Sequence, residues 1–74
     1  MKILLISCGA TRPDVRAITN MLEEIGEDLD SSLARELTEI LLDGSEVEIE
    51  VSDKITSSAF RALRKHDIDY EIME

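Results

Sequence analysis

Residues 7–12, Ser-Cys-Gly-Ala-Thr-Arg, hold the only cysteine of the chain and are the clearest candidates for covalent chemistry. Cys8 follows a short apolar run typical of a strand, and helix-start signals come a few residues later. Anions bind where a strand leads into a helix N-terminus, and a thiol at such a position becomes more reactive. The segment therefore suggests a thiolate that carries a phosphoryl group.

Two phosphate-handling families place a cysteine at this point. Residues 2–9 look similar to the EIIB-type components of sugar phosphotransferase systems, whose loop contains further Gly and Ser/Thr residues that wrap a phosphocysteine. Low-molecular-weight phosphatases have Cys, five residues and then Arg, but here Asp14 occupies that position and Arg12 follows after only three residues. A carboxylate there repels phosphate. We therefore expect a structural thiol and no enzyme, and keep a Cys8 phosphoryl carrier as the enzymatic alternative.

A second set of candidate residues is acidic and has a period of two. Glu46, Glu48 and Glu50 alternate with Val47, Ile49 and Val51, the pattern of a strand with one buried and one wet face. Alternate side chains on one strand face stand about 7 Å apart. A row of like charges costs stability, and a basic partner would offset that cost. A charged strand that discourages edge pairing is the simpler explanation.

The acids also suggest cation binding, because Ca²⁺ takes six to eight oxygen ligands. Asp28 and Asp30 are close in sequence, and Asp43 and Glu46 form a second weak cluster. The EF-hand spacing with its glycine is absent. We therefore expect no metal and no cofactor. His66 follows Arg64 and Lys65 and is interpreted as part of a helix end.

Composition limits the class of protein. The 74 residues predict a single domain, 1–74, with 43% hydrophobic residues and a net charge of -9. The charge and the single Phe, single Tyr and absence of Trp argue against direct nucleic-acid binding. The longest apolar run, residues 3–6, is too short for a membrane span or a signal-peptide core. We expect a cytoplasmic protein that does not bind membranes.

The negative charge is concentrated in the middle of the chain. Residues 23–50 carry eleven acids against one base, Arg35, whereas the remainder carries six acids and seven bases. An acidic middle segment favours electrostatic attraction to a basic surface of another protein.

The first half of the chain predicts a strand and two helices. Residues 2–7 form the strand. A first helix, capped by Thr11 with Pro13 in its first turn, ends near Gly26. Ser31 or Ser32 caps a second helix that ends at Gly44. The two inward-facing stripes would be Val15, Ile18, Leu22 and Ile25, and Leu33, Leu37, Ile40 and Leu41.

The second half predicts strand, helix and strand. Val47, Ile49 and Val51 face inward, and Ser52-Asp53 turns the chain and caps a third helix with Phe60 at its margin. Positive charge in the last turn of that helix suits its dipole. Ile68, Tyr70 and Ile72 alternate with acids as a final strand.

These elements predict an α+β two-layer sandwich, β-α-α-β-α-β, with a three-stranded sheet and three helices on one face. The opposite face would carry the strand acids. If Ile3 and Leu5 point inward, Leu4 and Ile6 form an apolar strip on that opposite face, which suggests a partner or a homodimer seam. Alternatively, the first strand faces the other way or the chain end covers the strip.

The order and lengths of the elements resemble the fold shared by the ClpS adaptor and the C-terminal domain of the bacterial ribosomal stalk protein. Residues 2–6 look like the first strand of ClpS, Thr11 and Pro13 are similar to its Thr-Pro, and Gly44 closes the second helix as a Gly does in ClpS. Residues 51–54, Val-Ser-Asp-Lys, are similar to the Val-Ser-Lys turn of the stalk domain.

The resemblance implies a non-enzymatic protein-binding module. ClpS uses an Asn-Asp pair and a His to bind N-terminal degrons, where this chain has Ser7-Cys8 and Leu41-Leu42. The stalk domain docks translational GTPases through a basic helix face, where this chain is acidic.

The resulting hypothesis is a small acidic adaptor or regulator that binds a basic protein surface. A nucleic-acid mimic that inhibits a DNA- or RNA-binding protein is the alternative. The expected partner-binding residues are Glu46, Glu48, Glu50, Leu4, Ile6, Asp28 and Asp30.

Overall fold

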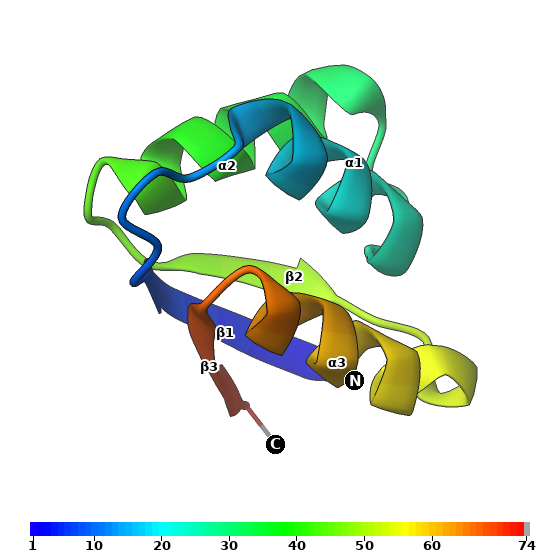
Figure 1. The fold of residues 1–74 in the computed structure, drawn as a ribbon. Helices are drawn as coiled ribbons and strands as arrows, with labels where there is room; N and C mark the ends of the chain where they lie inside the picture. The colour runs from blue at the N-terminus through cyan, green and yellow to red at the C-terminus, as the bar shows by residue number, and fades with distance from the viewer. Residues whose placement is uncertain (74) are drawn as a thin grey trace.

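The chain forms three strands and three α-helices in the order expected from the sequence (Figure 1). The structure, a computed structural model, describes residues 1–73. The elements are β1 (Lys2–Cys8), α1 (Val15–Ile25), α2 (Ser31–Leu42), β2 (Val47–Glu50), a short 3₁₀ turn (Asp53–Ile55), α3 (Thr56–Lys65) and β3 (Ile68–Ile72). Within the described residues, no helix is both long enough and apolar enough to cross a membrane.

The three strands form one antiparallel sheet in the order β2-β1-β3. The first strand of the chain is thus the central one. Ile3 pairs with Ile49 on one side and with Ile72 on the other. The pairing of β1 with β3 shifts register between Leu5 and Ser7, so that Cys8 lies opposite Ile68.

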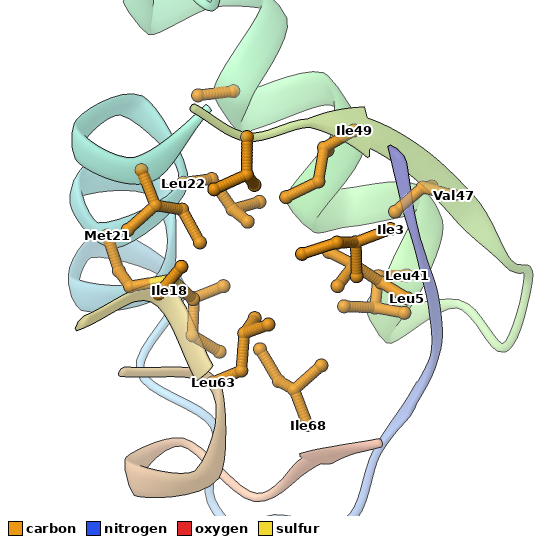
Figure 2. Close-up of a cluster of buried hydrophobic side chains, with 14 residues drawn as sticks. Ile3, Leu5, Ile18, Met21, Leu22, Leu41, Val47, Ile49, Leu63 and Ile68 are labelled. Atoms are coloured by element: carbon orange, nitrogen blue, oxygen red, sulfur yellow. The ribbon is translucent and has the colours of Figure 1, made fainter. Parts of the chain in front are cut away.

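One face of the sheet and all three helices enclose the hydrophobic core (Figure 2). Ile3 and Leu5 of β1 are completely buried, as are Leu22 of α1 and Leu63 of α3. This arrangement confirms the predicted two-layer α+β fold, and it shows that Ile3 and Leu5 point inward, one of the orientations that the sequence left open. The buried apolar residues are Ile3, Leu5, Ile18, Met21, Leu22, Ile25, Ala34, Leu41, Val47, Ile49, Val51, Ala59, Leu63 and Ile68.

The helix caps differ from those expected. Asp14 caps α1, with its carboxylate accepting the N–H of Ala17 at 3.0 Å, and Asp30 caps α2 by accepting the N–H of Leu33 at 2.8 Å. The expected caps Thr11 and Ser31 or Ser32 were wrong. An Asp three residues before the amide reaches it directly, and this geometry leaves Thr11 and Pro13 outside the helix.

The buried face of α2 also differs from the expected stripe. Ala34, Thr38 and Leu41 are buried, whereas Leu33 and Ile40 are 40% and 38% exposed. The Thr19 hydroxyl of α1 donates to the Thr38 hydroxyl at 3.2 Å, and Thr38 donates to the Ala34 carbonyl at 2.8 Å. Small side chains allow the two helices to approach closely, and this turns the larger Leu33 and Ile40 outward.

The connections at both ends of α2 depend on glycine for different reasons. A side chain at Gly26 would lie 2.9 Å from the carbonyl oxygen of Leu22, so the position lacks space. Gly44 has a φ of 100°, a left-handed conformation that suits the end of a helix. Gly26 also forms a bridge with Val51 beyond the end of β2, which ties the α1–α2 connection to the sheet.

Candidate functional site

The face of the sheet opposite the helices places an apolar strip between two acidic rows. Leu4 of β1 pairs with Glu48 of β2 and with Glu71 of β3, so these three side chains share the outer face. Leu4 and Ile6 are half-buried. We call this surface the acidic sheet face; its acids are Glu48, Glu50, Asp69 and Glu71 of the strands together with Glu46, which directly precedes β2, and all are exposed.

The orientation of β1 excludes one alternative left open by the sequence, namely that the first strand faces the other way. Ile3 and Leu5 are 0% exposed, so Leu4 must point to the other face. In residues 1–73 no helix covers that face, because all three helices contribute to the core on the inner side. Leu4 is half-buried because it lies between the carboxylate-bearing side chains of the flanking strands.

Two cations partly neutralise the acids Glu46, Glu48 and Glu50, which we call the β2 row. The Lys2 ammonium lies 3.8 Å from the Glu48 carboxylate. The Met1 ammonium lies 3.1 Å from Glu50 and 3.4 Å from Asp53. Its hydrogen bond to Glu50 raises the pKa of the Met1 amino group, with a smaller contribution from Asp53 and an opposing effect of partial desolvation.

The β3 row lacks comparable neutralisation. Asp69 accepts a hydrogen bond from the Ser7 hydroxyl at 3.3 Å. Within residues 1–73, no lysine, arginine or amino terminus forms an ion pair with Asp69, Glu71 or Glu46. The expected binding set did not include Asp69 and Glu71, although their alternation with Ile68, Tyr70 and Ile72 was the signal that could have added them.

Asp28 and Asp30 lie on a different part of the molecule. The Asp30 carboxylate is used as the cap of α2, and Asp28 has a φ of 58° in the connection between α1 and α2. Both helices lie on the inner side of the sheet, and the start of the connection is bonded to the end of β2, because the Glu27 N–H donates to the Glu50 carbonyl at 2.8 Å (Figure 1). The structure therefore places Leu4, Glu48 and Glu50 on the outer face of the sheet, with Glu46 directly before β2 and Ile6 at the register shift of β1. Asp28 and Asp30 lie instead in the α1–α2 connection, at the edge of the sheet beside the end of β2.

Cys8 has the surroundings of a structural thiol. The register shift in β1 turns its side chain toward the core, against which it packs, and the thiol donates to the His66 carbonyl at 3.4 Å. At the N-terminus of α1, the Asp14 carboxylate accepts the Ala17 N–H. An anion at this helix end would meet a negative charge, so these contacts do not favour a phosphoryl carrier.

A surface depression of about 430 Å³ lies where the end of β1, the end of α3 and the start of β3 meet. Arg64, Asp67 and Asp69 line it with Gly9 and Ile68. Its two carboxylates and one guanidinium form a wet, mixed-charge surface. Across the described part of the chain, no group of three or more His, Cys, Asp or Glu side chains is placed to hold a metal ion.

Comparisons of the chain with protein-family models, with curated proteins and with solved structures find no match. The resemblance to ClpS and the stalk domain therefore stays a prediction. Function must be inferred from the geometry of the chain itself.

Proposed function

We propose that this chain is a non-enzymatic protein-binding module, an adaptor or regulator in the cytoplasm, whose acidic sheet face binds a basic surface of another protein. The observation that carries the proposal is the apolar strip of Leu4 and Ile6 between two exposed acidic rows. The implied likeness to ClpS and the stalk domain supports it, since both are protein-binding modules.

The two parts of the face would act at different stages of binding. The acids attract a basic partner over about a Debye length and raise the association rate. Exposed ion pairs add little affinity by themselves. Desolvation of Leu4 and Ile6 supplies the centre of the contact, surrounded by the charged rim, as in many transient interfaces.

The proposal is tested with two matched triple variants. Glu46→Lys, Glu48→Lys and Glu50→Lys reverse the β2 row, whereas Glu24→Lys, Glu36→Lys and Asp43→Lys make the same change in net charge on exposed positions of the helical layer. Each variant and the parent chain are immobilised, and proteins retained from a host lysate are eluted with increasing salt and identified. Thermal unfolding confirms that each variant folds.

We expect the parent chain and the helical-layer variant to retain the same basic protein. The β2-row variant is expected to lose it. Equal retention by all three chains, or loss in both variants, would remove the acidic sheet face as the binding surface. Displacement of the retained protein by short duplex DNA would identify nucleic-acid mimicry as the form that the binding takes.

A further inference from the structure

The outer edge of β3 presents unpaired backbone groups. The Met73 N–H donates to the Lys2 carbonyl at 2.9 Å, so the N–H and C=O of Ile72 point the other way, away from β1. The same alternation turns the backbone N–H and C=O of Tyr70 outward, away from β1. Within residues 1–73, no backbone hydrogen bond reaches the N–H or C=O of Tyr70 or Ile72 from the free side.

The corresponding edge of β2 is closed at its C-terminal end. The Val51 N–H donates to the Met1 carbonyl, so the backbone N–H and C=O of the preceding residue, Glu50, point away from β1. There the Glu27 N–H donates to the Glu50 carbonyl at 2.8 Å, and Gly26 bridges to Val51. The α1–α2 connection thus covers one edge of the sheet, whereas β3 lies uncovered at the other (Figure 1).

The two sides of β3 differ chemically. On the inner side, the Tyr70 ring stacks on Phe60 of α3 with 4.9 Å between ring centres, and Ile72 beyond it is 51% exposed. On the outer side, Asp69 and Glu71 are exposed. A strand added here would place alternate side chains beside apolar and acidic neighbours.

Charge decides which occupant fits. A second copy of this chain, paired antiparallel about Tyr70, would place Asp69 of one copy opposite Glu71 of the other, and like charges directly opposite destabilise a strand pair. An extended segment with alternating apolar and basic residues has the complementary pattern on both sides.

We propose that the β3 edge is a strand-addition site for an extended, cationic amphipathic segment of another protein. The segment pairs with the outward groups of Tyr70 and Ile72, covers the exposed side chain of Ile72, and places its basic residues beside Asp69 and Glu71. The inference rests on the proposed function, because the partner is basic in both, but it assigns a specific edge and backbone conformation to the contact.

The test uses an acetylated and amidated peptide of alternating sequence, Lys-Val-Lys-Ile-Lys-Val-Lys, titrated into the folded chain in about 0.15 M salt. The Tyr70 and Ile72 amides are expected to exchange rapidly in the free chain, and the peptide is expected to protect both. A peptide of the same composition with its lysines in one block is expected to bind about tenfold more weakly, as is the alternating peptide methylated at its internal amides.

Variants of the chain supply the matched controls. Ile72→Pro removes an outward N–H that no described group uses, and is compared with Ile72→Ala, which keeps it; the proline variant is expected to bind about tenfold more weakly. Asp69→Asn with Glu71→Gln is expected to weaken binding more than Glu46→Gln with Glu48→Gln. Thermal unfolding of each variant verifies its fold, and the methylated peptide tests the same hydrogen bonds on the unaltered chain.

The outcomes separate the two proposals. Unprotected Tyr70 and Ile72 amides, or equal binding of the alternating, block and methylated peptides, would overturn strand addition. If the Glu46/Glu48 pair has the larger effect, the peptide lies across the acidic sheet face, and the proposed function stands without the edge site. Protection of Ile72 in the free chain that rises with concentration would identify a second copy as the occupant and overturn the inference.

Discussion

The two faces of the sheet contain neighbouring residues of the same type with different surroundings. Leu5 is completely buried under the helices, whereas Leu4, the preceding residue of β1, is half-buried among carboxylates. The inner face supplies the packing that stabilises the fold, and the outer face carries exposed charged side chains. Stability and recognition are therefore expected to respond to different substitutions, even within one strand.

The largest expected effect uses this pair of leucines directly. Leu5→Ala is expected to lower the free energy of unfolding by about 2–5 kcal/mol, because it leaves a cavity in a closely packed core. Leu4→Ala removes the same atoms from the outer face and is expected to cost about 1 kcal/mol or less. Urea unfolding followed by circular dichroism measures both. Equal losses would mean that the two faces are equally packed.

The buried layer between α1 and α2 is not entirely apolar, because it contains the hydrogen-bonded pair Thr19 and Thr38. Thr38→Val removes the acceptor for the Thr19 hydroxyl, which is 9% exposed, and is expected to cost about 1–3 kcal/mol. Adding Thr19→Val is expected to recover part of this loss, because neither partner then leaves an unpaired hydroxyl. A double-mutant cycle by urea unfolding measures the coupling, and strictly additive effects would contradict the role of the hydrogen bond.

Asp30 provides the next test. The sequence suggested that it binds a partner, whereas in the structure its carboxylate accepts the Leu33 N–H and caps α2. Asp30→Ala is expected to destabilise the chain by about 1 kcal/mol through loss of the α2 cap. Ser31→Ala, at the next residue, is expected to change stability by less than about 0.5 kcal/mol. Thermal unfolding distinguishes them. A larger loss for Ser31→Ala would restore the serine as the cap.

The smallest expected effect concerns the cation at the edge of the acidic sheet face. The hydrogen bond to Glu50 raises the pKa of the Met1 amino group above its usual value of about 8. Its contribution to stability is therefore complete below about pH 8 and lost as pH rises through the raised pKa. Acetylation of the amino group in the 74-residue chain should remove this dependence. Identical stability curves for both forms between pH 7 and 10 would contradict it.

The order of elements could be predicted because each has a clear period and a clear stop. Alternation between Glu46 and Val51 identifies a half-buried strand, and Gly26 and Gly44 mark helix ends. The apolar strip of Leu4 and Ile6 followed from the period of β1 once its inward face was chosen. That choice needed the structure, because all four residues 3–6 are apolar.

Other details depend on contacts between distant residues. The stripe of large residues on α2 predicted Leu33 and Ile40 as buried, but the close approach of α1 selects the small Ala34 and the paired Thr38 instead. The inward position of Cys8 follows from a register shift against β3. Hydrophobic periodicity within one segment contains no information about either.

The position of β1 in the middle of the sheet has a consequence for how the chain folds. The contact between Ser7 and Asp69 spans 62 residues, so the second side of β1 stays unpaired, and the open edge of the sheet is absent, until β3 is available. Before that, the α1–α2 hairpin can form from contacts between helices that are neighbours in the sequence. Pairing between distant strands slows folding, and a chain interrupted before β3 exposes an unpaired β1. During synthesis, incomplete chains should therefore remain open to proteolysis until the final strand emerges.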